Sequence, residues 1–240
     1  MEKYILKIEL LSDAIFSGGE SIVSVSDIDE LYDEYKIPYY KGKSIKGNIR
    51  ESADLIIRNQ EKINPDKYKQ NKNIVRILFG KNFFKKSEEN NEKYDEIEEI
   101  YRDDQTEGIL KFENASLEDD LKENLKYLID KNIISKEELI NSLTDIRYAT
   151  KIDRNTGTAE TGSLRSMRVL NKGIIFTSNI YSERELTEDE LGLLVCAVKI
   201  TRHLGTLRSR GKGNVKCTLV TTKEKLSENN IKELVEKAVG

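Results

Sequence analysis

The sequence predicts an α+β domain whose core follows the order βαββαβ and carries helical, charged and hairpin insertions. Three observations support this prediction. Apolar and polar residues alternate near both ends of the chain, which is the period of half-buried strands. Amphipathic helical patterns follow the first and the third core strands. The resulting order, with an insertion between the two halves, is that of a ferredoxin-like or RRM-like fold, although fold alone assigns no function.

The first half of the core begins with a strand expected at Tyr4 to Leu10. Ser44 is the expected N-cap of a helix that continues to about residue 60. The run IVRILFG at 74–80 is apolar and ends at a glycine. Residues 81–106 are highly charged and poor in apolar residues, so we expect a disordered insertion there.

The inserted region continues after a second core strand, which is expected at 108–115. A helix with leucines at helical spacing follows at 117–128, and Ser135 with Glu138 forms a capping box for another helix. Residues 145–171 are basic and rich in threonine and glycine. This composition favours a projecting hairpin over a core element.

The second half of the core starts with a strand at 173–182. Thr187 and Glu190 form a capping box for the helix that follows it. The last strand is expected to contain Val215 and Leu219, and a final amphipathic helix starts near Ser227.

The composition fits one domain spanning residues 1–240, with 37% hydrophobic and 35% charged residues. Its net charge of −3 is uninformative, because local basic and acidic patches decide nucleic-acid binding. No apolar run has transmembrane length and no signal peptide is evident, so we expect a cytoplasmic protein without membrane association. Cys196 and Cys217 are expected to be core residues. The single histidine, His203, excludes a two-histidine acid–base mechanism.

The connection between the last helix and the last strand is basic and rich in glycine. It holds Gly205, Gly211 and Gly213 between basic side chains, with no acidic residue. Glycines allow left-handed backbone angles, and successive amides with arginines can bind phosphate. A helix-to-strand connection with solvated charges would explain one glycine but not three. Residues 205–215 are therefore predicted to form a phosphate-binding loop.

A second basic segment lies at the start of the first predicted helix. Lys43, Lys46 and Gly47 surround its N-terminus, where free amides and the helix dipole favour an anion. Lysines at this end are unfavourable for the helix alone, so a negatively charged partner is expected to offset them.

Four segments together resemble the RAMP superfamily, the RNA-binding proteins of CRISPR effector complexes. They are IPYYKGKSIKGNIRE at 37–51, LFG at 78–80, the hairpin sequence IRYATKIDRNTGTAETGSLRSMRVL and the loop GTLRSRGKGNV. The pieces occur in the family's order and cover most of the chain. The resemblance is to backbone subunits of type III complexes, especially III-D-like ones.

This resemblance implies that several copies line up along a CRISPR RNA, beside other effector subunits, and that the 145–171 hairpin acts as a thumb that displaces a base at regular intervals. Complementary single-stranded target RNA is the second implied partner. The residues implied to contact RNA are Lys43, Ser44, Lys46, Gly47, Arg50, Arg154, Arg165, Arg168, Arg208, Arg210, Gly211, Lys212 and Gly213.

Cleavage of the target RNA is implied for an aspartate in the loop before residue 37. Counting back from Asp33, which matches a family aspartate, gives Asp27, and Asp29 is the alternative because the segment is about one residue shorter than the family's. An ionised carboxylate there can hold Mg²⁺ loosely or accept a proton from the RNA 2′-OH. Two departures from the family are Lys41, which replaces a proline, and the acidic insertion. Without the resemblance, Asp27 and Asp29 would be interpreted as solubilising loop residues.

Three alternatives remain open at this point. A non-catalytic capping or scaffold subunit would bind the RNA without cutting it. A processing endoribonuclease of the same superfamily usually has two ferredoxin-like halves and an early histidine, neither of which is evident here. A protein–protein adaptor would carry no bound nucleic acid after purification, which separates it from the other two.

Overall fold

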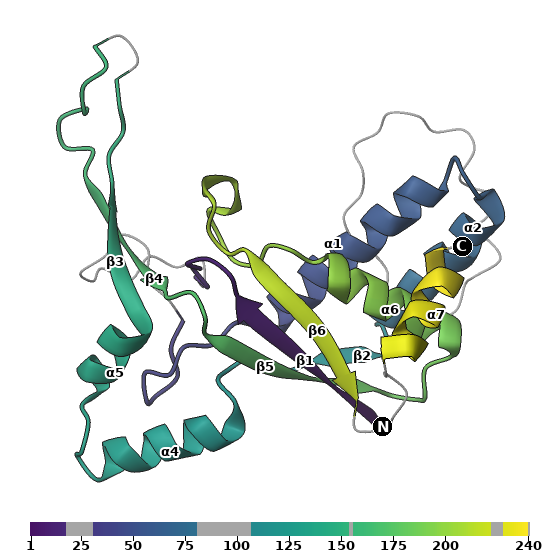
Figure 1. Cartoon of the computed structure of the whole chain (residues 1–240), viewed down its shortest axis with the longest axis horizontal. Coiled ribbons are helices and arrows are strands. Elements are labelled where there is room, and N and C mark those ends of the chain that lie inside the picture. Colours follow the sequence, from purple (N-terminus) through teal and green to yellow (C-terminus); the bar gives the residue numbers. More distant parts are fainter. Residues whose placement is uncertain (18–30, 81–106, 154–155, 222–227, 240) are drawn as a thin grey trace.

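The computed structural model describes residues 1–17, 31–80, 107–153, 156–221 and 228–239. A four-stranded antiparallel sheet lies at its centre, in the order β2-β5-β1-β6 (Figure 1). The strands are β1 (Glu2–Leu10), β2 (Leu110–Phe112), β5 (Ile175–Ser182) and β6 (Val215–Thr221), and α1 (Gly42–Gln60) and α6 (Glu188–Ile200) complete the core. The mixed α+β class and an antiparallel, RRM-like core are therefore confirmed.

The main hydrophobic core lies between this sheet and the helices. Strand β1 alternates as predicted, and Leu6 and Ile8 are fully buried. Ile8 is paired with Phe176 of β5 and Cys217 of β6, so each buried row crosses three strands. Ile45 of α1 is among the helix residues in the same apolar cluster. Because neighbouring side chains of a strand point to opposite faces, the other face of the sheet carries residues such as Thr218, which is exposed.

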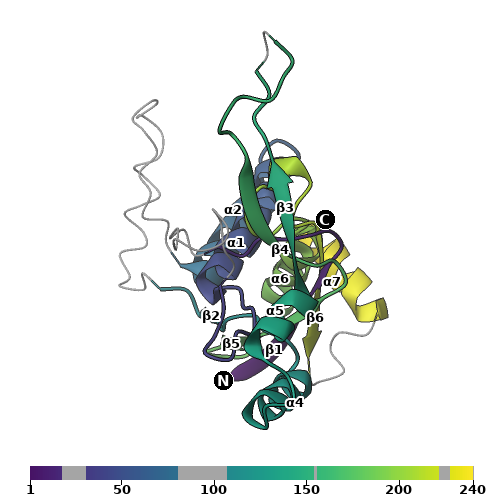
Figure 2. The same ribbon diagram turned by 90° about the vertical axis from the view of Figure 1, so that its left-hand side faces the viewer.

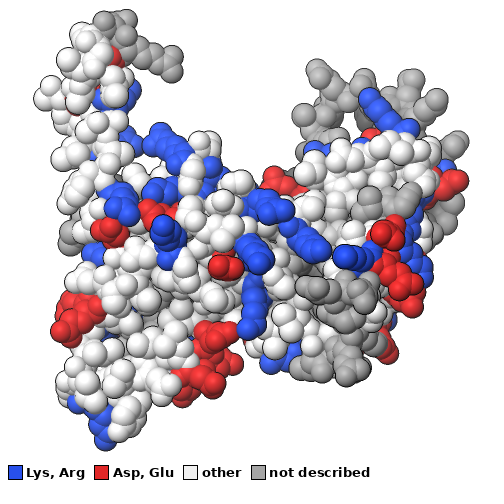
Figure 3. All heavy atoms as spheres, in the orientation of Figure 1, with Lys and Arg blue, Asp and Glu red and all other residues white. Residues whose placement is uncertain are grey.

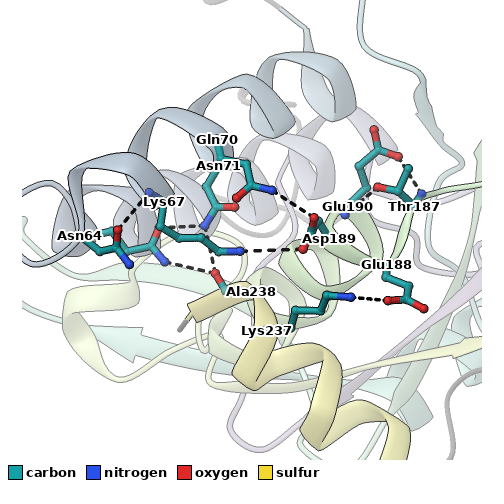
Figure 4. Close-up of polar contacts among 11 residues, drawn as sticks. Asn64, Lys67, Gln70, Asn71, Thr187, Glu188, Asp189, Glu190, Lys237 and Ala238 are labelled. Carbon is teal, nitrogen blue, oxygen red and sulfur yellow. Dashed lines mark hydrogen bonds and ion pairs between the residues drawn. The ribbon is translucent and has the colours of Figure 1, made fainter.

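Helices α2 (Pro65–Phe79) and α7 (Glu228–Val239) extend the helical layer. The apolar run at 74–80 is the second half of α2 and its C-cap, although the sequence indicated neither helix nor strand for it. The Asn71 amide donates to the Ala238 carbonyl at 3.0 Å and to the Gln60 side chain at 2.8 Å. These bonds, with the contact of Gln70 to Asp189 at 3.0 Å, join α2 to α1, α6 and α7 (Figure 4).

A second, smaller apolar cluster lies beneath α4 (Asp119–Asp130) and α5 (Lys136–Leu143). The capping box of Ser135 and Glu138 is present at the start of α5, and the one predicted for α6 is also present. The prediction of Ser44 as the N-cap of α1 is wrong. The N-cap is Lys41, three residues earlier, and the Asn114 side chain accepts a hydrogen bond from the Gly42 amide at 2.9 Å.

The segment expected to project forms a separate two-stranded sheet. Strands β3 (Thr144–Ala149) and β4 (Arg165–Leu170) pair antiparallel, and Figures 1 and 2 show them extending away from the core. We call residues 144–170 the hairpin. The predicted insertion at 81–106 lies outside the described residues. None of the described helices is long and apolar enough to cross a membrane.

Both cysteines are core residues, as predicted. The Cys196 and Cys217 thiols are free and buried, one in α6 and one in β6. Burial raises the pKa of Cys196 to about 11 and that of Cys217 to about 12.

Candidate nucleic-acid interface

The glycine-rich segment 205–213, which we call the G-loop, folds back on itself before β6. The Leu204 amide donates to the Gly213 carbonyl at 2.9 Å, and a short 3-10 helix, η2 (Arg208–Arg210), forms the tip. Gly205, Gly211 and Gly213 all have positive φ angles. A Cβ at Gly213 would lie 1.9 Å from the Leu204 carbonyl oxygen, whereas one at Gly211 would meet nothing within 4 Å. The backbone path therefore explains all three glycines.

Several of the G-loop amides are used within the protein. The Thr206 amide donates to the Ile15 carbonyl at 3.0 Å, and the Gly213 amide to the Asp13 carbonyl at 2.7 Å. The amides of Arg210 and Gly211 close the η2 turn. The expected cradle of free amides is therefore wrong for these groups. At these positions, anion binding by the G-loop would have to come from side chains and not from the backbone amides.

The G-loop is fixed between helix α1 and the hairpin. On the α1 side, the Gly205 amide donates to the Tyr40 hydroxyl at 3.4 Å, and Arg208 donates to the Asn48 side chain at 3.3 Å. On the hairpin side, Leu207 packs against a small apolar cluster that contains Met167 and Val169. Basic residues from three distant parts of the sequence therefore share one region of the surface.

One carboxylate joins the G-loop to the hairpin directly. The Asp13 Oδ2 atom lies 2.9 Å from Lys212 Nζ and 3.1 Å from Arg147 Nε. Partial burial of Asp13 would raise its pKa, but hydrogen bonds from Lys212 and Arg147 outweigh this effect and hold the pKa below its ordinary value. Sequence reasoning missed Asp13 and Arg147. An acidic residue within the apolar sequence LLSDAIF was the only available signal.

The predicted RNA-contacting cations divide into two groups. Lys43, Arg165 and Arg210 are exposed, and their side chains have no ion-pair or hydrogen-bond partner among the described residues. By contrast, Lys46 donates to the Leu110 carbonyl at 2.8 Å, and its burial lowers its pKa. The first group is available to an anion in this conformation, whereas Lys46 is already used to hold α1 against β2.

Arg168, Arg208 and Lys212 belong with Lys46 in the engaged group. Arg168 donates to Thr144 at 2.9 Å, on the hairpin face that is opposite Met167. Arg208 also lies 3.6 Å from a Glu51 oxygen, but nearly half of its side chain is exposed, so this pair is weak. The structure therefore does not bring Arg168 onto the same face as the G-loop.

The remaining predicted contacts lie around the start of α1 or cannot be placed. Ser44 is half-buried and Gly47 is exposed. Arg50 is mostly buried, with its Nε atom 4.0 Å from an Asp54 oxygen. Arg154 lies outside the described residues. The first amide of the helix, at Gly42, is already bonded to Asn114, so it is not free for an anion.

The loop that contains both candidate catalytic residues, Asp27 and Asp29, lies outside the described residues, but its two ends are described. The Leu31 amide donates to the Phe16 carbonyl at 3.3 Å, so the ends lie side by side. The Phe16 ring stacks on Tyr40, and a Cβ at Gly205 would lie 3.1 Å from it. The loop therefore leaves and rejoins the fold directly beside the G-loop.

Asp33, which set the count toward the catalytic position, has a structural role. Its Oδ1 atom accepts hydrogen bonds from the Tyr35 and Ile37 amides at 3.0 and 2.9 Å, and its other oxygen lies 3.8 Å from Lys122. These contacts fix the turn that leads into Pro38. No group of three side chains suited to a metal ion occurs among the described residues.

Basic side chains gather around the G-loop and the base of the hairpin. Figure 3 shows Lys and Arg along the concave edge between the hairpin and the helical layer, with a few acidic side chains among them and further acidic side chains on the lower and outer edges. A polyanion that follows this edge would pass the hairpin, the G-loop and the start of α1. The region is therefore our candidate nucleic-acid interface.

The sequence was also compared with models of known protein families. The model of the RAMP superfamily matches residues 7–216, which is most of the chain. The chain belongs to the RAMP superfamily. All four motifs that resembled this family lie inside the matched range, including the G-loop and the start of α1.

Solved structures show the same fold as this RAMP protein. A chain of a type III-B Cmr-beta complex in the apo state has a TM-score of 0.58 and 14% sequence identity, with coverage of 94% of this chain and 99% of that chain. A chain of a type III-B Cmr-beta complex bound to cognate target RNA has the same score and identity, with coverage of 98% and 99%. Among curated proteins, none matches the sequence.

Proposed function

We propose that this RAMP protein is a backbone subunit of a type III CRISPR effector complex, of III-D-like type, that binds CRISPR RNA and cleaves complementary target RNA. The observation that carries the proposal is the position of the G-loop between α1 and the hairpin. The Gly205 amide bonds to Tyr40, and Leu207 packs against the apolar cluster that contains Met167, so three sequence-distant basic segments lie on one surface. Phosphate contacts from such a surface give affinity without selecting a base sequence, as a changing guide requires.

Within this surface, Lys43, Arg165 and Arg210 are the cations available for phosphate in the described conformation. Gly47 and Gly211 are exposed and would allow the RNA backbone to approach closely, whereas Gly213 is buried and serves the path of the loop. Arg168 and Lys46 would first have to leave their present partners. The hairpin would act as the thumb that separates one base from the next.

Cleavage is assigned to Asp27, with Asp29 as the second choice. RNA supplies its own nucleophile in the 2′-OH, so the protein has to align the chain, accept a proton and neutralise charge on the phosphate. The described ends of this loop, at Phe16 and Leu31, lie beside the G-loop, which supports the assignment because bound RNA would pass there. Mg²⁺ held by the aspartate would supply part of the charge neutralisation.

Replacement of the two aspartates tests the catalytic assignment. We expect Asp27→Ala to reduce target cleavage by a factor of about 10²–10⁴, with guide and target binding near wild type. Asp29→Ala serves as the matched control for the sequence count. A comparable loss in Asp29→Ala with active Asp27→Ala would move the assignment by two residues. Cleavage that survives the double replacement would refute the catalytic role and favour a non-catalytic scaffold or capping subunit. A purified protein that carries no bound RNA would favour the adaptor function.

A further inference from the structure

Asp13 is contacted by two parts of the candidate interface at once. Its Oδ2 atom accepts hydrogen bonds from Lys212 of the G-loop and Arg147 of β3, and its backbone carbonyl accepts one from the Gly213 amide. The residue itself lies shortly after the end of β1, which is an inner strand of the core sheet. A single residue therefore connects the core, the G-loop and the hairpin.

The charges at this point require an anion. The Lys212 and Arg147 nitrogens both lie within 3.1 Å of one oxygen, so the two cations are close neighbours and would repel each other without the carboxylate. Only 18% of the Asp13 side chain and 22% of the Lys212 side chain are exposed. Solvent and salt therefore screen this pair less than an ordinary surface ion pair.

Two backbone hydrogen bonds between Ala14 and Leu170, at 3.1 and 2.8 Å, hold the base of β4 next to Asp13. Among the described residues, the other side-chain contacts between the hairpin and the G-loop are few. One small apolar cluster joins them, in which Ile15, Met167 and Val169 are buried and Ala149 and Leu207 are partly buried. A cluster of this size resists separation of the hairpin but specifies its direction weakly, because apolar contacts are non-directional. The hydrogen bonds to Asp13 are directional, and they cross from the G-loop to the hairpin.

We propose that Asp13 is a positioning residue that fixes the direction in which the hairpin projects from the G-loop, and that it withholds Lys212 and Arg147 from RNA phosphate in doing so. The first part concerns the RNA-free protein. The second part rests on the proposed function, because it concerns how the same surface binds RNA.

The structure offers a matched control in Asp145. Its Oδ2 atom lies 2.8 Å from the same guanidinium of Arg147, but both residues belong to β3. Asp145→Asn therefore removes the same charge and also breaks an ion pair with Arg147, without removing any link between the hairpin and the G-loop. Asp13→Glu keeps the charge with a longer side chain.

The direction of the hairpin can be measured without RNA. Spin labels are attached to cysteines introduced by Thr161→Cys in the hairpin and Asn59→Cys at the end of α1. Double electron–electron resonance then measures the distribution of distances between the two labels. We expect a narrow distribution for the otherwise unchanged protein and for Asp145→Asn, a broad one for Asp13→Asn, and an intermediate width for Asp13→Glu. A distribution for Asp13→Asn as narrow as that of Asp145→Asn would overturn the proposal.

Arg147→Gln removes the hairpin partner of Asp13, so the test does not depend on the folding of the Asp13 variant alone. It should broaden the distribution as Asp13→Asn does. An unchanged width in a folded Arg147→Gln protein, shown by an unaltered circular dichroism spectrum, would also overturn the positioning role.

RNA binding tests the second part. Titration with a single-stranded RNA of mixed sequence at several salt concentrations should give a steeper salt dependence for Asp13→Asn, by about 0.7 in the logarithmic slope for each freed cation that reaches a phosphate. Asp13→Glu and Asp145→Asn should keep the wild-type slope. An Asp13→Asn slope equal to wild type would refute the withholding of Lys212 and Arg147. If the wild-type protein binds no RNA, the proposed function fails, whereas the spin-label result still decides the positioning role.

Discussion

Replacement of the two available arginines should weaken RNA binding in a salt-dependent manner without disturbing the fold. Arg165 and Arg210 come from the hairpin and the G-loop, and both side chains are exposed without a partner among the described residues. Their joint replacement by alanine should change the free energy of unfolding by less than about 0.5 kcal/mol, as is usual for surface positions.

The size of the binding effect follows from the number of phosphates that the variant no longer neutralises. For a single-stranded RNA, each phosphate that is no longer neutralised reduces the magnitude of the slope of log K against log salt by about 0.7. The magnitude of the slope should therefore be smaller by about 1.4 in the double variant. The ratio of wild-type to variant affinity should therefore change about 25-fold for each tenfold change in salt concentration. Sequence preference should stay unchanged, because phosphate contacts do not read bases.

Fluorescence anisotropy of a labelled RNA across a salt series measures this slope. The matched control is Lys62→Ala with Lys69→Ala, which removes two exposed positive charges near the junction of α1 and α2. Its slope should be near that of the wild type. Equal slopes for the Arg165/Arg210 variant and wild type would refute the assignment of these cations to phosphate.

Two further predictions concern stability, and a third concerns the response of the hairpin to RNA. Gly213→Ala should lower the free energy of unfolding by about 3 kcal/mol, because its Cβ would collide with a backbone carbonyl. Gly211→Ala should lower it by only about 1 kcal/mol, because no atom lies within 4 Å of its Cβ. Equal effects of the two substitutions in urea denaturation would contradict this prediction. Burial would raise the pKa of Glu190, but hydrogen bonds from Arg184 outweigh this effect and lower the pKa. The free energy of unfolding should therefore fall as the pH drops from about 5 through the folded pKa. This decrease should be absent from Glu190→Gln. Amide exchange in the described part of 152–164 should slow when RNA binds, and equal exchange with and without RNA would count against a thumb role.

Local signals made much of the fold predictable. A strand's alternation and a capping box are both encoded within a few residues, so β1 and the start of α5 at Ser135 were correctly predicted. The start of α1 was not, because its cap is supplied by Asn114, far along the chain. A side chain that caps a helix from another element leaves no local sequence pattern.

The candidate site shows the same limit. Sequence composition indicated which loops are basic, but not which cations are free. Lys46 is held by the backbone of Leu110, and Lys212 by Asp13, which is 199 residues away. Only the tertiary structure brings these partners together. The available cations therefore had to be separated from the engaged ones by geometry.

The two buried thiols make this chain convenient for site-specific chemistry. Thiol reagents attack the thiolate, and at pH 8 a group with the pKa of Cys196 is ionised in only about one molecule in a thousand. Cys217 is ionised still less, and both side chains are also buried from reagents. A cysteine introduced at an exposed position would therefore react far ahead of the native pair. Fluorophores, spin labels and crosslinkers can be attached at chosen positions while both native cysteines stay in place.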